Sequence, residues 1–218
     1  MIQIKYTLLA LLASGSFFLG CGETPNAPTP ETNAFNDDSG NVITVNPAPS
    51  RVPGGAERVL CIAKETLSFA KEHLDIEDVE IQIGFNARVA IPGYGIGGFS
   101  GNEHSAEVNI DPDFPQLDAV LNERLAYILL HELHHAVRHK EPGYGSTLLE
   151  ALVSEGLADH FATTLLGVAL PPWSTALEEA ELQEFRGLAH RELLSKDYWH
   201  GRWFFGETTE IPNWTGYS

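Results

Sequence analysis

Positive charge is scarce in this chain. Its 218 residues include 13 Lys and Arg against 30 Asp and Glu, which gives a formal net charge of −17. Nucleic acids and anionic lipid surfaces are bound mainly through Lys and Arg side chains that neutralise phosphate. The composition therefore argues against nucleic acid and against anionic membrane surfaces as partners. It promotes solubility, and it identifies no substrate.

The chain also lacks a hydrophobic run long enough to cross a bilayer comfortably. Its start carries Lys5 and then an apolar run from Tyr6 to Leu19 that small polar residues interrupt. A membrane-spanning helix needs about 20 apolar residues, whereas a basic start followed by a shorter apolar run is typical of an export signal. We therefore predict that residues 1–20 form a signal peptide that is removed from the mature protein.

Cysteine is rare, with only Cys21 and Cys61 in the chain. The segment Phe-Leu-Gly-Cys that ends at Cys21 resembles the bacterial lipobox, which implies cleavage before Cys21 and lipidation of its thiol. The resemblance, with Gly22 in the next position, implies a lipid-anchored protein of the bacterial cell envelope at the outer membrane, facing the periplasm or the surface. An ordinary secretory signal is the alternative. If Cys21 is lipidated, Cys61 has no partner within the chain, so we expect a buried, unpaired Cys61 and a fold without disulfides.

The segment 21–53 has no hydrophobic period and is rich in Pro, Thr, Asn, Ser and Asp. Such a composition is typical of a disordered tether between an anchor and a folded unit. The remaining residues, 54–218, are enough for one domain with a sizeable core and too few for two. We therefore predict three parts: a signal peptide at 1–20, a tether at 21–53 and one folded domain at 54–218.

The sequence HELHH at 131–135 contains the HExxH spacing of a helical zinc-hydrolase site. On a helix, positions four apart lie one above the other, so His131 and His135 can reach one metal ion while Glu132 projects beside it. The segment 121–140 has a helical apolar period that leaves both histidines on the opposite face. This pattern predicts a catalytic zinc site with Glu132 as the general base.

A third ligand is expected from the segment 148–167, which also has a helical apolar period and ends at Gly167. Glu155 and Asp159 lie four apart on this second helix. If the two helices pack together, Glu155 can complete a His/His/Glu zinc site, a ligand set known in zinc peptidases. Asp159 would then accept a hydrogen bond from a zinc-bound imidazole and fix its tautomer.

HELHH followed by LVSEGLADHFA resembles the gluzincin clan of zinc metallopeptidases. It is similar to a family of zinc-dependent peptidases carried as a domain of unknown function. The resemblance runs from about Ala56 to the C-terminus, and its specific part is residues 126–162. It implies an α+β fold: a zincin-like single domain, mainly helical, with a small antiparallel or mixed sheet beside the active-site helix.

Two other metal-binding patterns involve the same helix. The metzincin pattern requires Gly at 138 and His at 141, but the chain has Arg138 and Glu141, so that class is excluded. His134 and His139 could each pair with a neighbouring histidine on the same helix. Neither of those pairs has a glutamate beside it as HExxH does.

The residues before the HExxH helix predict two strands, 79–85 and 106–110, which a glycine-rich stretch separates. Gly93, Gly95 and Gly98 match GxGxxG, but this run leads into a strand instead of a helix, so a dinucleotide site is excluded. We expect a hairpin or flap beside the cleft, in which the second strand presents an edge to an extended peptide. His104 is expected to be a loop residue.

The C-terminal part predicts a helical stretch at about 171–194 and then an aromatic tail that we expect to pack in the core, with the wall of a substrate pocket as the alternative. The predicted function is a zinc-dependent peptidase whose partners are a peptide or protein substrate and, through the lipid anchor, the membrane. Two alternatives stay open: a non-catalytic zinc-binding envelope lipoprotein, and a metal hydrolase of a non-peptide amide or ester. A second donor to the developing oxyanion is also needed. Its candidates are Tyr217, Tyr198, His190 and His200.

Overall fold

A computed structural model describes residue 21, residues 33–208 and residues 210–218. The predicted signal peptide and residues 22–32 of the predicted tether lie outside the described residues. In the described part no helix combines the length and the apolar character that crossing a membrane requires.

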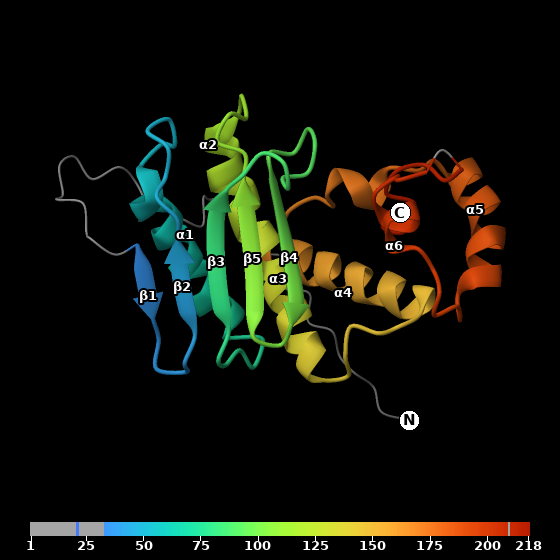
Figure 1. Ribbon diagram of the computed structural model, residues 1–218, viewed down its shortest axis with the longest axis horizontal. Coiled ribbons are helices and arrows are strands. Elements are labelled where there is room, and N and C mark those ends of the chain that lie inside the picture. The colour runs from blue at the N-terminus through green and yellow to red at the C-terminus, as the bar shows by residue number, and fades with distance from the viewer. Residues whose placement is uncertain (1–20, 22–32, 209) are drawn as a thin grey trace.

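A five-stranded mixed sheet forms the centre of the fold, in the order β1-β2-β3-β5-β4 (Figure 1). The outer pairs β1 with β2 and β4 with β5 are antiparallel, and the inner pairs β2 with β3 and β3 with β5 are parallel. The strands are β1 (Ala34–Asn36), β2 (Val42–Val45), β3 (Glu80–Phe85), β4 (Ile96–Asn102) and β5 (Ser105–Ile110). This mixed sheet with helices confirms the predicted α+β class and both predicted strands.

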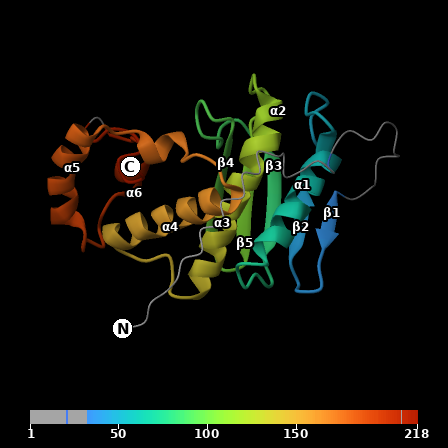
Figure 2. The ribbon, with the colours of Figure 1, turned by 180° about the vertical axis from the view of Figure 1, so that it is seen from behind.

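Helices cover one face of this sheet, as the rear view shows (Figure 2). The crossover helix α1 (Gly55–Ala70) joins the parallel strands β2 and β3, and α3 (Leu125–Lys140) lies across β4 and β5. The strands are one-sided for this reason: Ile81 and Ile83 are buried while Glu80 and Gln82 are exposed. Alternation of this kind is expected where one face of a sheet is packed and the other meets water.

The continuous helical segment that contains HExxH begins before the predicted start at residue 121. A short helix α2 (Leu117–Ala119) and a π-helical turn η1 (Val120–Arg124) run directly into α3. The face of α3 that packs toward the sheet includes Leu125, Leu129 and Leu133, all fully buried. The predicted helical apolar period is therefore confirmed, and it fixes the direction in which the histidines point.

The second helix, α4 (Leu148–Leu166), ends at Gly167 as predicted, with Gly167 in the left-handed conformation, and it begins at a capping box that had not been predicted. It packs against α3, and its fully buried residues include three with small side chains: Ala158, Ala162 and, in the core formed with the C-terminal part, Ala151. Leucines and valines of its apolar pattern lie instead on the exposed side: Leu149, Val153 and Leu157. Small side chains let the two helices approach closely, which brings the carboxylates of α4 near α3.

The C-terminal part forms a second, smaller core beside α4. It contains a 3₁₀ turn η2 (Pro172–Thr175), α5 (Glu179–Glu192) and α6 (His200–Phe204) (Figure 1). Trp203 and Phe204 are buried there with Leu148 and Ile211. For these two aromatic residues the predicted core packing is confirmed.

The prediction of a disordered tether up to residue 53 is wrong for the part from Ala34 onward. This part supplies β1 and β2, and Ile43 and Val45 are buried in the main core. Asn41, fully buried, donates to the Ile76 carbonyl and accepts from the Val79 amide, so it ties this hairpin to the residues before β3. Two strands of three and four residues are too short to show a clear period in the sequence.

The prediction of an unpaired Cys61 is also wrong, because Cys21 and Cys61 form a disulfide. The described Cys21 lies buried next to α1, with a Cα–Cα separation from Cys61 of 5.8 Å, a usual distance for a disulfide. The expectation of a fold without disulfides is corrected accordingly. A thiol in a disulfide cannot also carry a lipid, so the lipidation predicted for Cys21 describes a different chemical state of this residue.

The predicted hairpin beside the cleft is confirmed, but its edge strand was misidentified. The second predicted strand, β5, lies between β3 and β4 and is paired on both sides. The glycine-rich stretch itself forms β4, which is the edge of the sheet nearest α4 (Figure 1). Glycine weakens strand propensity, which hid this strand in the sequence.

Candidate metal centre

His131 and His135 lie one turn apart on α3 and point into the same space. Their Nε2 atoms are 3.0 Å apart, and both side chains are buried. Two neutral imidazoles whose Nε2 atoms face each other can share only one proton between them. A cation between the two nitrogens would satisfy both lone pairs, which is how histidines bind metals.

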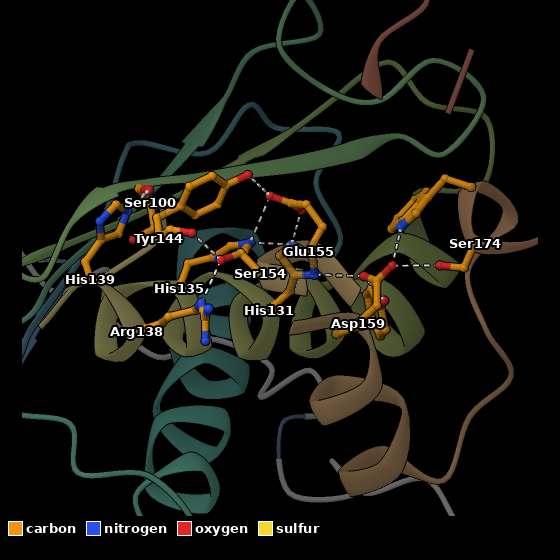
Figure 3. A network of polar contacts seen from close by, with 12 residues as sticks. Ser100, His131, His135, Arg138, His139, Tyr144, Ser154, Glu155, Asp159 and Ser174 are labelled. Carbon is orange, nitrogen blue, oxygen red and sulfur yellow. Dashed lines mark hydrogen bonds and ion pairs between the residues drawn. The ribbon is translucent and has the colours of Figure 1, made fainter. Parts of the chain in front are cut away.

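Glu155 reaches the same space from α4. Its Oε2 lies 3.3 Å from Nε2 of His131, and its Oε1 lies 3.4 Å from Nε2 of His135 (Figure 3). Burial opposes the ionisation of Glu155, but the two histidines outweigh it and hold the pKa of this carboxyl well below its usual range. Ligand atoms of all three side chains lie within 4.8 Å of one another. The residues predicted to hold zinc are thus brought together, and their donor set fits that metal.

Asp159 accepts a hydrogen bond from Nδ1 of His131, the ring nitrogen that faces away from the other two ligands. Its Oδ1 lies 2.8 Å from Nδ1 of His131 and 2.5 Å from the Tyr127 hydroxyl, and its Oδ2 accepts from Trp173 Nε1 and Ser174 Oγ. Burial raises the pKa of Asp159, but the bonds from His131 and the hydroxyls outweigh it, and the net shift is downward. An ionised carboxylate only accepts, so Nδ1 of His131 carries a proton. Burial lowers the pKa of His131, but the bonds to Asp159 and Glu155 outweigh it and hold this pKa well above its usual value, so a metal at Nε2 would take the place of a proton.

Glu132 lies on the other side of the histidines, against the edge strand. It is buried, and burial raises the pKa of its carboxyl to about 8, with His131 opposing the rise and Glu155 adding to it. Its neighbour on β4 is Gly98, and a Cβ at this position would lie 2.4 Å from Oε1 of Glu132. Gly98 therefore leaves the space that the Glu132 carboxylate occupies.

Tyr144 is the part of the site that the sequence did not reveal. It lies in the loop between α3 and α4, its hydroxyl donates to Oε1 of Glu155 at 2.5 Å, and its ring packs on His135. The loop is held in turn because Ser154 donates to the Tyr144 carbonyl and Arg138 donates to Ser154 (Figure 3). No sequence pattern links a loop tyrosine to a carboxylate eleven residues later, so this contact depends on the fold.

A cavity of about 620 Å³ opens above these residues, between β4 and the C-terminal part. Of the four candidate oxyanion donors, Tyr217 and His200 line it, whereas Tyr198 contacts His200 and packs on the second core, and neither Tyr198 nor His190 lines the cavity. Part of the aromatic tail therefore forms a cavity wall, which was the alternative to the expected core packing. The aromatic residues of this wall are Phe205, Trp214 and Tyr217, with Trp173 beside them.

His134, His139 and the glycine motif are not part of the three-ligand set. His139 contacts the Ser100 carbonyl and lines the cavity, and the His134 ring packs on Phe161 and against His135. His104 is an exposed residue between β4 and β5, as predicted. The run of Gly93, Gly95 and Gly98 leads into β4, which agrees with the exclusion of a dinucleotide site.

A family model matches more than half of the chain. The model of a family described as "Predicted Zn-dependent protease (DUF2268)" matches residues 79–218, a range that includes α3, α4 and the aromatic C-terminal part. Among curated proteins and among solved structures, none matches the chain.

Proposed function

Because the chain belongs to the family of predicted Zn-dependent proteases (DUF2268), we propose that it hydrolyses peptide bonds at a zinc site formed by His131, His135 and Glu155. The convergence of these three side chains at the floor of a cavity, with Glu132 beside them, is the observation that carries the proposal. Three protein ligands leave a coordination position for water or substrate, as catalytic zinc sites require.

Zinc supplies two effects in such a site: it lowers the pKa of a bound water, and it polarises the carbonyl of the scissile bond. The protein prepares the ligands for this metal. Asp159 fixes the His131 tautomer, and the hydrogen bond from Tyr144 orients the Glu155 carboxylate. Ligands that are already oriented lose little freedom when the metal binds.

Glu132 is the proposed general base. Its carboxylate lies between the histidines and β4, where it can take a proton from the attacking water and later pass it to the leaving amine. Its pKa of about 8 is that of the metal-free site, and a metal cation nearby lowers it. A carboxylate that is ionised near neutral pH is suited to this role.

Tyr217 is the proposed donor to the developing oxyanion. Burial raises the pKa of its hydroxyl well above the usual value, so it is protonated and can donate. Within the described residues this hydroxyl has no hydrogen-bond partner, whereas the Tyr144 hydroxyl is occupied by Glu155. A free donor in the cavity wall is available to a substrate oxygen.

We also propose that the protein is exported to the cell envelope. The apolar start with its lipobox supports export and lipidation of Cys21. The disulfide between Cys21 and Cys61 supports an oxidising compartment as well, although it uses the same thiol. Intact mass after reduction and alkylation separates the two states, because a lipid thioether survives reduction and a disulfide yields two alkylated thiols.

The experiment for the catalytic proposal compares the wild-type protein with Glu132→Gln, loaded with zinc, on quenched short peptides and on a quenched unstructured protein. We expect Glu132→Gln to keep one zinc per chain and to lose hydrolysis by at least about 10³-fold, since it removes the base and leaves the ligands. Glu184→Gln, on the exposed side of α5, is the matched control and should behave as wild type. Undiminished hydrolysis in Glu132→Gln would remove the proposed mechanism.

A further inference from the structure

The backbone of β4 faces alternately toward β5 and toward the free edge of the sheet. The Gly95 carbonyl accepts from Asp111 at the end of β5, whereas the Ile96 carbonyl accepts from Ile91 and the Ser100 carbonyl contacts His139, both on the other side. Since successive residues of a strand present their backbone groups to opposite sides, Ile96 and Gly98 face the free edge. The pairing with β5 is irregular between Phe99 and Asn102, and the contact with His139 shows that the Ser100 carbonyl also faces this edge. A peptide that extends the sheet beside the candidate metal centre would pair with these residues.

One end of this free edge is closed by the loop between β3 and β4. The Ile91 amide donates to the Ile96 carbonyl at 3.2 Å, and the backbone of this loop also lies against Gly97. A Cβ at Gly97 would lie 2.7 Å from the Val89 carbonyl oxygen, so the loop is in direct contact with the strand. A bound peptide cannot pair with β4 beyond Ile96 without moving this loop.

The other end is closed by a side chain from α3. His139 Nε2 lies 3.1 Å from the Ser100 carbonyl, and since a carbonyl only accepts, this nitrogen carries the proton. The ring of His139 stacks on Tyr144 at 5.7 Å, so the loop after α3 holds it in place (Figure 3). A peptide that continued past Ser100 would have to displace both side chains.

Gly98 is left between the two closed ends. In the described part of the chain no group at the free edge bonds to the amide or the carbonyl of Gly98. Gly98 also lies directly beside Glu132. Ile96 and Ser100 are four residue steps apart, which corresponds to about 14 Å of extended strand. The edge can therefore pair with about four substrate residues, centred where the general base lies.

We infer that the cleft is built for short peptides, and that it selects oligopeptides of about four to six residues over internal segments of longer chains. The inference rests on the proposed peptidase activity and adds the class of substrate. A longer chain gains no backbone pairing outside the segment 96–100. It also has to leave the edge at both ends, past the Ile91 loop and past His139, which costs contacts or displaces protein groups.

The test uses the full zinc-loaded chain and a series of quenched peptides that share one central tetrapeptide. Gly-Ser extensions lengthen them to 6, 8 and 12 residues at either end. We expect kcat/KM to fall at least about tenfold between 6 and 12 residues. His139→Ala should raise the ratio of 12-residue to 6-residue kcat/KM at least about threefold for extensions at one end only, because the obstacle lies at one end. His139→Gln, which keeps an N–H donor, should restore the wild-type ratio.

The length inference is overturned if wild-type kcat/KM rises with length, or if His139→Ala changes short and long peptides by the same factor. These results differ from a failure of the proposed function. In that case no peptide of any length is cleaved, or Glu132→Gln cleaves them as fast as wild type. A purely structural role of His139 would lower activity on all lengths alike and leave the ratio unchanged.

Discussion

Gly98→Ala probes the contact between the edge strand and the general base. The added Cβ would lie 2.4 Å from Oε1, 2.5 Å from Cγ and 2.8 Å from Cδ of Glu132. Non-bonded heavy atoms are at their best about 3.5 Å apart, so the Glu132 side chain has to retreat by about 1 Å. Glu132 is buried between α3 and β4, so its retreat shifts the carboxylate from the position in which it lies beside the three ligands.

The expected loss of activity follows from this displacement. A 1 Å error in the position of a reacting group costs on the order of 10²-fold in rate, or about 2.7 kcal/mol of transition-state stabilisation. We therefore expect Gly98→Ala to lower kcat about 10²-fold. Zinc content should stay at the wild-type value, because the three atoms nearest the new methyl group all belong to Glu132 and none to a ligand.

The assay measures zinc content, steady-state kinetics and thermal unfolding for the variant and a control. Gly101→Ala is the matched control on the same strand, since its Cβ would approach only the side chain of exposed Phe99, at 3.0 Å. It should keep activity within about threefold of wild type. Wild-type kcat in a folded Gly98→Ala would refute the assigned contact, and loss of zinc together with activity would show that the methyl group disturbs the ligands instead.

Three further outcomes are expected. Asp159→Asn should weaken zinc binding roughly 10- to 100-fold in a chelator competition, because it removes the acceptor that orients His131, and unchanged affinity would contradict this role. A chain of residues 54–218 should have a free energy of unfolding at least about 3 kcal/mol lower than that of residues 33–218, since it loses two buried strand residues and exposes the edge of β3. Equal stability of the two chains would contradict the revised boundary. Burial opposes the ionisation of Asp37, but hydrogen bonds from Asn41 and Lys71 outweigh it and lower the pKa of this carboxyl from 3.8 to about 2. The ionised carboxylate therefore stabilises the folded state above pH 3.8, and this contribution is lost as pH falls through 2. Asp37→Asn should therefore lower the free energy of unfolding by about 1 to 2 kcal/mol at pH 7 and by nearly nothing at pH 2, and a difference that does not depend on pH would contradict this assignment.

The sequence predicted the elements whose chemistry is local. HExxH on an apolar helical period places His131 and His135 on one side of α3, because position on a helix follows from spacing alone. Glu155 and Asp159 were found for the same reason, since they lie one turn apart on a second helix. The contact between these two helices could only be assumed from the sequence, and the structure shows that they are in contact.

Features that depend on distant parts of the chain were missed. Gly98 reads as part of a flexible glycine-rich loop, yet it is a strand residue whose missing side chain makes room for Glu132. Tyr144 reaches Glu155 only through the path of the loop after α3. The buried face of α4 was also hidden, because its small residues carry less hydrophobic signal than the exposed Leu149, Val153 and Leu157.

The most direct test of the central claim is zinc stoichiometry, measured on the purified full chain as wild type, Glu155→Ala and Glu184→Ala. We expect one zinc per chain in wild type and in Glu184→Ala, whose position is exposed on α5. Glu155→Ala should lose tightly bound zinc together with chelator-sensitive peptide hydrolysis. One zinc retained by a folded Glu155→Ala would contradict the proposed ligand set.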